Sequence, residues 1–106
     1  MSEDQDNFND LTVSWTENGQ EVVRELSREV IQKSSSWATI AFLFEEWDGA
    51  TGCFGPPRTQ VRRYRKRSGR WQVNGKLVLG SEEAARNLAR VIQEWFRPVR
   101  AKRKQT

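Results

Sequence analysis

The chain contains 106 residues and carries a formal net charge of +4, with one cysteine and no histidine. A chain of this length forms one small domain, whose core is just large enough for independent stability and would gain from oligomerisation. The absence of histidine and the isolation of Cys53 remove the usual general base, the usual metal ligands and any intrachain disulfide. We therefore expect no enzyme, no catalytic residue, no cofactor and no metal ion.

Acidic and basic residues are separated along the sequence. Of the 14 acidic residues 11 lie before Arg58, and of the 18 basic residues 15 lie from Arg58 onward. A basic half of this kind favours a polyanionic partner. The longest apolar run, 37–44, is far too short to span a bilayer, and the chain starts with acidic rather than signal-like residues. We therefore expect a cytoplasmic protein without membrane contact.

The first 19 residues are acidic and polar, which predicts a disordered or weakly structured tail over 1–19. Within this tail, 11–15 alternates weakly before the turn signal Glu17-Asn18-Gly19 and is either a short strand or an unstructured lead-in. The folded domain is predicted to cover 20–97. A flexible cationic tail is predicted over 98–106, where it would add phosphate affinity.

Two strands are predicted at the start of the domain. The apolar residues of 20–33 fit either a strand or a helix, and we favour a strand because three serines then form a turn before an unmistakable strand. That next strand, 37–47, is β-branched and aromatic, and both of its faces are apolar through Phe44. Such a strand is central and covered twice, by a helix and by a partner chain or ligand. This pattern indicates a dimer.

The most informative stretch is 58–79, which has the pattern of a basic β-hairpin. The pair Ser68-Gly69 lies between two strand-like runs, and its glycine is able to take positive φ in a tight turn. The turn fixes the register of the whole hairpin. The predicted register pairs Arg67 with Arg70, Arg65 with Gln72, Arg63 with Asn74 and Val61 with Lys76.

Side-chain alternation divides the hairpin into two surfaces. One surface is cationic with no interleaved acid, and like charges on one sheet face repel unless a polyanion neutralises them. A phosphate backbone is the commonest such polyanion, and a merely solvated strand face is the plain alternative. The cationic surface is predicted to hold Arg63, Arg65, Arg67, Arg70, Gln72, Asn74 and Lys76, and the core face Tyr64, Trp71, Val73, Leu77 and Leu79.

A helix is predicted over 80–96. Ser81 is a good N-cap, Glu82 and Glu83 place negative charge at the positive end of the helix dipole, and Pro98 forces the stop. The apolar residues recur at the spacing of a helix that lies on a sheet.

These elements predict an α+β fold in which a four-stranded antiparallel sheet is followed by a C-terminal helix (ββββα). The order resembles the bacterial type of the single-stranded DNA-binding transcriptional coactivator family, the positive-cofactor-four type. The resemblance covers 37–96 and is carried by Gly75-Lys76-Leu77-Val78-Leu79-Gly80-Ser81-Glu82-Glu83, although the strand-to-helix junction is a residue shorter here. It implies a homodimer whose helices pack together and whose curved sheets present basic and aromatic residues to unpaired nucleic acid.

We therefore expect a non-enzymatic protein that binds single-stranded nucleic acid, DNA in preference to RNA, in the role of a transcriptional cofactor. Cations would follow the backbone and aromatic rings would stack on bases. The alternative is a protein-interaction module whose basic sheet docks an acidic partner. Core packing is the better interpretation of Trp71, and for Tyr64 the two interpretations are nearly equal. The expected contacts are Arg62, Arg63, Tyr64, Arg65, Lys66, Arg67, Arg70, Gln72, Asn74 and Lys76, and the expected stacking rings are Trp37, Trp47, Tyr64 and Trp71.

Overall fold

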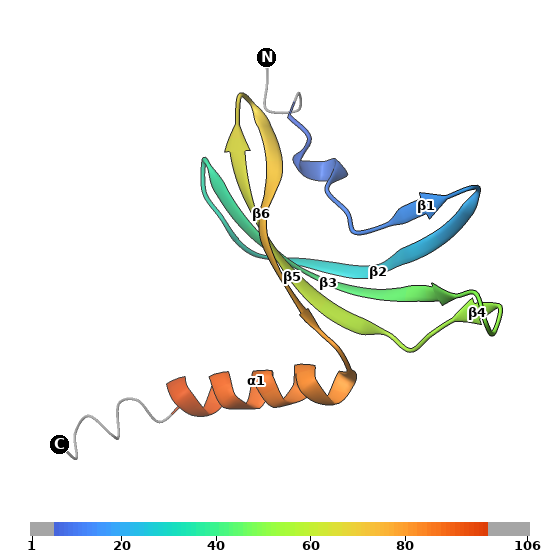
Figure 1. Cartoon of the computed structure of the whole chain (residues 1–106). Coiled ribbons are helices and arrows are strands. Elements are labelled where there is room, and N and C mark those ends of the chain that lie inside the picture. The colour runs from blue at the N-terminus through green and yellow to red at the C-terminus, as the bar shows by residue number, and fades with distance from the viewer. Residues whose placement is uncertain (1–5, 98–106) are drawn as a thin grey trace.

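The computed structural model describes residues 6–97. Within this range the chain forms a curled antiparallel sheet and one α-helix, which leaves the sheet at its last strand (Figure 1). The predicted tail over 98–106 and residues 1–5 of the N-terminal tail lie outside the described residues. The elements are the 3-10 helix η2 (Phe8–Asp10), β1 (Trp15–Glu17), β2 (Gln20–Lys33), β3 (Trp37–Asp48), β4 (Cys53–Phe54), β5 (Arg58–Arg67), β6 (Arg70–Leu79) and α1 (Glu82–Phe96).

The strand order is β1-β2-β3-β5-β6, every pairing is antiparallel, and the short β4 pairs with β3 beside this path. The α+β class and the C-terminal helix are confirmed. The expected count of four strands is approximate, because the short strands β1 and β4 add to the four long ones. We call the sheet face that carries the buried residues of β3 the inner face, and the opposite one the outer face.

The ambiguous stretch between Gln20 and Lys33 is the strand β2, so the favoured prediction is confirmed over the helical alternative. The pairing of β2 with β3 has register shifts at two places, which leave Leu26 and Ile31 without a partner opposite them. Both side chains are exposed. A bulge resets the alternation of a strand, and two of them spread the apolar residues of β2 into a helix-like spacing.

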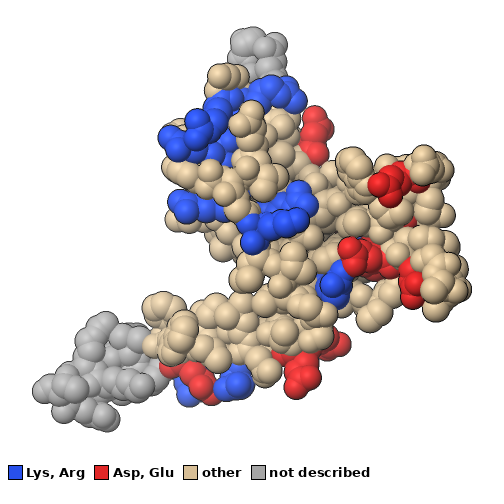
Figure 2. All heavy atoms as spheres, viewed as in Figure 1, with Lys and Arg blue, Asp and Glu red and all other residues tan. Residues whose placement is uncertain are grey.

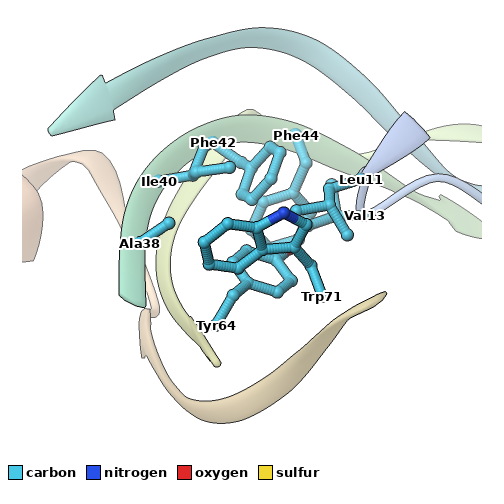
Figure 3. Packing of buried hydrophobic residues seen from close by; sticks show 8 residues of the cluster. All are labelled: Leu11, Val13, Ala38, Ile40, Phe42, Phe44, Tyr64 and Trp71. Atoms are coloured by element: carbon cyan, nitrogen blue, oxygen red, sulfur yellow. The ribbon is translucent and has the colours of Figure 1, made fainter. Parts of the chain in front are cut away.

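Strand β3 lies at the centre of the sheet, between β2 and β5. Its side chains alternate as the sequence predicts, because Ile40, Phe42 and Phe44 are almost fully buried on the inner face while Leu43 on the outer face is 39 % exposed. The inner residues pack with Tyr64 and Trp71 of the hairpin and with residues of the N-terminal segment (Figure 3).

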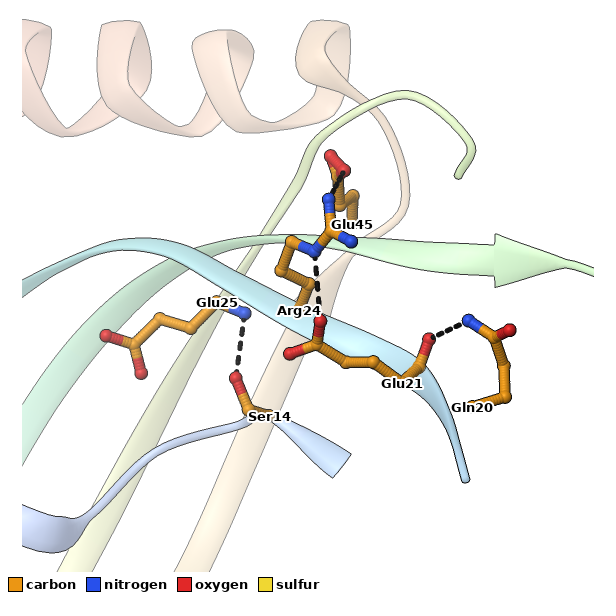
Figure 4. Close-up of polar contacts among 6 residues, drawn as sticks. All are labelled: Ser14, Gln20, Glu21, Arg24, Glu25 and Glu45. Carbon is orange, nitrogen blue, oxygen red and sulfur yellow. Dashed lines mark hydrogen bonds and ion pairs between the residues drawn. The ribbon is translucent and has the colours of Figure 1, made fainter. Parts of the chain in front are cut away.

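The structure differs from the expected N-terminal tail between Asp6 and Glu17. This segment crosses the inner face of the sheet, where Leu11 and Val13 are buried in the core. Polar contacts hold it to β2, since the backbone N–H of Glu25 donates to Oγ of Ser14 at 3.0 Å (Figure 4). The core therefore closes only when residues that precede the predicted domain fold onto it.

Helix α1 begins where the sequence predicts, because Oγ of Ser81 accepts a hydrogen bond from the backbone N–H of Ala84 at 3.1 Å. It does not lie across the sheet, however, and none of its residues is buried. Its contacts with the sheet are to β5 and β6, and its C-terminal end points away from the sheet (Figure 1). Ile92, Trp95 and Phe96 are consequently 42 %, 65 % and 69 % exposed.

The buried Tyr64 hydroxyl makes no hydrogen bond to any residue between Asp6 and Arg97. Replacing Tyr64 by Phe keeps the ring and removes a buried polar group, so we expect the free energy of unfolding in urea to stay the same or rise by up to about 1 kcal/mol. Phe42→Ala opens a cavity in the same core and should cost about 3–5 kcal/mol. A loss of more than about 1 kcal/mol in Tyr64→Phe would show that the hydroxyl has a partner after all.

Candidate nucleic-acid interface

The basic hairpin forms as the sequence predicts at its tip. Ser68 and Gly69 both take positive φ, 52° and 78°, which is the conformation of a tight turn whose twist matches the flanking strands. Ser68 is a non-glycine residue in this region, so the strand pairing on both sides stabilises the turn against its intrinsic cost. The predicted pairs of Arg67 with Arg70 and of Arg65 with Gln72 are confirmed.

Farther from the tip, the register shifts by one residue and leaves Asn74 without a partner on β5. The predicted pairs of Arg63 with Asn74 and of Val61 with Lys76 are therefore wrong. Arg63 instead faces Gly75, and Val61 faces Leu77. The extra residue is a β-bulge, which sequence alternation alone does not reveal.

The bulge moves the side chains of β6 beyond it to the opposite face. Lys76 pairs with Arg62, which lies on the inner face, so Lys76 leaves the predicted cationic surface. Leu77 and Leu79 move the other way, to the outer face. The prediction that these two leucines belong to the core is wrong, and Leu77 is 51 % exposed.

The other residues of the predicted cationic surface, apart from Asn74 in the bulge, stay on the outer face. We call them the outer basic surface. Its members are Arg63, Arg65, Arg67, Arg70 and Gln72, all exposed. None of these four arginines forms an ion pair with a residue in the described range 6–97. Figure 2 shows Lys and Arg gathered over the lobe that β5 and β6 form, while Asp and Glu lie mainly over the other lobe and the helix.

Arg24 on the acidic half of the sheet differs from the arginines of the outer basic surface, because acidic residues of the chain neutralise it. Arg24 on β2 lies 3.1 Å from Oε1 of Glu21 and 3.6 Å from Oε1 of Glu45, so its charge is satisfied within the chain (Figure 4). The arginines of the outer basic surface have no such partner among the described residues, and an anion bound beside them would relieve their mutual repulsion.

An aromatic ring lies within the outer basic surface. Trp37 is opposite Arg65 in the pairing of β3 with β5. The guanidinium carbons of Arg63 and Arg65 lie 4.1 and 4.9 Å from the centroid of its ring. Both distances are within the range of cation–π attraction. The contact holds the two guanidinium groups in place beside a flat aromatic surface, which is the combination that stacks bases and binds phosphates.

Two of the predicted stacking rings are inaccessible in this structure. Tyr64 and Trp71 are 1 % and 3 % exposed and belong to the core on the inner face. Burial raises the pKa of the Tyr64 phenol, and the nearby Arg62 guanidinium opposes this rise. Trp47 lies at the other end of β3 from Trp37 and packs edge-on against Phe54, with a centroid distance of 5.3 Å. Trp37 is thus the one predicted ring among the cations.

The other predicted contacts lie apart from the outer basic surface. Arg62, Lys66 and Lys76 are on the inner face, and Asn74 is the bulge residue. Lys66 is already paired, since its Nζ lies 3.1 Å from Oδ2 of Asp6. The structure therefore divides the ten predicted contact residues between the two faces of the hairpin.

The ion pair of Asp6 with Lys66 is one of several contacts between residues 6–8 and the hairpin. We call this set of contacts the clamp, and it was not predicted from the sequence. Nε1 of Trp71 donates to Oδ2 of Asp6 at 3.2 Å, and the Asn7 amide bonds both backbone groups of Trp71 at 2.7 and 3.1 Å. The ring of Phe8 packs edge-on against Trp71, with Nζ of Lys33 4.9 Å from the Phe8 centroid. The only sequence signal for it was the acidic composition of the N-terminus opposite a basic hairpin.

No group of three or more potential metal ligands occurs among residues 6–97, and α1, the single α-helix there, is too short and polar to cross a membrane. Comparison with known proteins found no matching family model, no similar curated protein and no similar solved structure.

The carboxylate of Asp6 accepts hydrogen bonds first from the backbone N–H of Phe8 and then from Lys66 and Trp71, and these hold its pKa below the ordinary 3.8. Because folding lowers this pKa, the ionised carboxylate of Asp6 stabilises the folded state above pH 3.8. This stabilisation is lost as the pH falls through the folded-state pKa. We expect the indole N–H resonance of Trp71 to titrate below pH 3.8 in NMR spectra.

The matched variant is Asp6→Asn, in which this titration should be absent, and the indole of Trp37 serves as an internal control. A Trp71 titration that persists in Asp6→Asn, or that is centred at or above 3.8, would contradict the assigned contact.

Proposed function

We propose that this protein binds single-stranded nucleic acid without catalysing a reaction. The observation that carries the proposal is the outer basic surface, where four arginines have no ion-pair partner among residues 6–97 and two of them, Arg63 and Arg65, lie against the ring of Trp37. Phosphates of the strand would neutralise the arginines, and a base would stack on the ring of Trp37 or on a guanidinium held against it.

The shape of the surface favours an unpaired strand over a duplex. The cations lie on a β-hairpin rather than on a helix that could enter a major groove. On the solvent-facing side of α1, both arginines form ion pairs with glutamates. Base faces are available for stacking only where the strand is unpaired. We propose DNA as the ligand and transcription as the setting, in line with the resemblance of the hairpin and helix start to single-stranded DNA-binding coactivators.

We further propose that the functional unit is a homodimer built on the apolar stripe of α1. The stripe consists of Ala84, Ala85, Leu88, Val91, Ile92, Trp95 and Phe96, none of which is buried and the last three of which are exposed. Beside its N-terminal end lies a hollow of about 620 Å³, lined in part by Leu43, Pro57, Ala85 and Ala89. Small residues thus line one end of the stripe, whereas the other end carries large aromatic rings. Two copies that pair their helices in antiparallel fashion would place the large end of one in the hollow of the other.

Charge supports the same antiparallel arrangement. Glu82 and Glu83 lie at the small end of the stripe, and Arg97 follows its large end. An antiparallel pair brings Arg97 of each copy toward the acidic pair of the other, and it also aligns the two helix dipoles favourably. A parallel pair would set like charges against each other.

A specific observation also supports the alternative, a docking surface for an acidic protein segment. The carboxylate of Asp6 already lies on Lys66 at 3.1 Å, so the hairpin accepts an acidic peptide at its inner face. The outer basic surface has no such contact within residues 6–97, and the stacking ring beside its arginines is a feature that an acidic peptide does not require.

The double variant Arg63→Ala/Arg65→Ala tests the proposed interface. The double variant removes two proposed phosphate contacts and the two guanidinium groups that lie against the ring of Trp37. We therefore expect affinity for a labelled single-stranded oligonucleotide to fall roughly tenfold or more at moderate salt. The slope of log affinity against log salt concentration should decrease by about 0.7 for each lost contact. Fluorescence anisotropy measures both, with the matching duplex as the competing ligand.

The matched control is Arg86→Ala/Arg90→Ala, which removes the same charge from the helix, and it should change affinity far less. Equal losses in the two double variants would mean that binding follows net charge alone. Absence of binding by the unaltered protein at low salt would refute the proposed function and leave the acidic-partner alternative.

The dimer is tested with Trp95→Ala/Phe96→Ala. These side chains are largely exposed in one copy, so their loss should leave the fold of that copy intact but remove most of the proposed contact. We expect the mass measured by light scattering to fall from that of two chains to that of one. Asn87→Ala/Gln93→Ala on the polar side of α1 should remain dimeric, and a monomeric unaltered protein at high concentration would refute the dimer.

A further inference from the structure

A groove of about 500 Å³ lies on the inner face, between the N-terminal segment and the ends of β5 and β6. Val13, Phe44 and Gln60, which are 4 %, 2 % and 5 % exposed, are its buried lining residues. Residues 12–15 line it from one side, and β6 contributes Lys76 and Val78 from the other. This volume is within the range of small-ligand sites in proteins.

The groove has an excess of positive charge. Arg58, Arg62 and Lys76 line it together with one acid, Glu46, which is ion-paired with Arg58. Arg62 and Lys76 form no ion pair with residues 6–97, although they face each other directly across β5 and β6. Like charges in such a pair destabilise a sheet unless an anion lies between them.

The guanidinium of Arg62 is held in a fixed orientation. Its Nε donates a 2.8 Å hydrogen bond to Oε1 of the buried Gln60, so the remaining guanidinium donors stay available for a ligand. Lys76 adds a second positive charge from the neighbouring strand. Together they match a phosphate group, which accepts charge-assisted hydrogen bonds from both residue types.

An aromatic ring completes the site. Trp15 also lines the groove, and it is 58 % exposed, an unusual exposure for so large an apolar ring. It makes no ring–ring contact with another described residue. A flat exposed ring beside two free cations is suited to a base attached to the phosphate that the cations bind.

The edge of the sheet connects this groove with the outer basic surface. No strand pairs with β6 beyond β5 within residues 6–97, so the edge of β6 is open. Arg62 and Arg63 are consecutive and lie on opposite faces, and Gly75 opposite Arg63 has open space where a side chain would be. A nucleic-acid strand therefore has room to pass over β6 at the bulge and to contact cations on both faces of the sheet.

We propose that the inner groove binds one nucleotide of the single strand whose neighbouring nucleotides lie on the outer basic surface. This inference rests on the proposed function. The phosphate lies between Arg62 and Lys76, and the base stacks on Trp15. The bulge at Asn74 makes this possible, because it places Lys76 beside Arg62 rather than on the outer face.

The test follows the five tryptophan indole N–H signals in NMR spectra during titration with an oligothymidylate of roughly 12 nucleotides. Tryptophan-to-phenylalanine variants assign the signals. We expect the signals of both Trp15 and Trp37 to shift, and in Arg62→Ala/Lys76→Ala only the shift of Trp15 should be lost. In a second titration, free thymidine monophosphate should move Trp15 and the side-chain amide of Gln60, whereas thymidine without phosphate should not.

Trp15→Ala provides an independent measurement, since this exposed residue can be replaced without opening the core. Loss of one stacked base should lower oligonucleotide affinity roughly tenfold. If the oligonucleotide moves Trp37 but not Trp15, and Trp15→Ala binds as tightly as the unaltered chain, the groove assignment is wrong while the proposed function stands. If free nucleotide moves Trp15 but the oligonucleotide does not, the groove is a mononucleotide site and the path over β6 is wrong.

Discussion

The apolar inner face of the curled sheet must be shielded from water, and the rest of the structure depends on which segment shields it. A single sheet with one apolar face cannot bury Ile40, Phe42 and Phe44 by itself, and a packed helix is the usual solution. Here the N-terminal segment covers that face, with Leu11 and Val13 in the core. The outer face and α1 are therefore left free, and a free outer face can hold a dense set of arginines without any cost to the core.

The bulge at Asn74 decides which face of the sheet Lys76 occupies. Between the turn and the bulge, the arginines of the hairpin lie on the outer face and its aromatic residues lie in the core. Beyond the bulge, Lys76 lies on the inner face beside Arg62, and Leu77 lies on the outer face. One unpaired residue thus creates two basic sites from one hairpin, because a shift of one residue reverses the face of every side chain that follows.

Contacts that hold the hairpin in place lie on its inner face, and the outer basic surface lies on the opposite side of the same strands. On the inner face, the contacts of Asp6 and Asn7 with Trp71 hold the hairpin to the N-terminal segment. On the outer face, Arg63 and Arg65 contact Trp37 and no acidic residue of the described chain. The clamp fixes the position of the strands, and the strands in turn fix the arginines. A cationic surface held in place in this way would lose little conformational entropy on binding the proposed single strand.

The sequence by itself determined the elements whose signals are local: the hairpin turn at Ser68-Gly69, the alternation of β3, and the start of α1 at its serine cap. It also determined that the cations would concentrate on β5 and β6. Only the tertiary structure decided that Lys76 lies on the inner face, because a bulge has no local signature in alternation. Likewise, it placed residues 6–14 in the core and left α1 off the sheet, since contacts between segments far apart in the sequence set both outcomes.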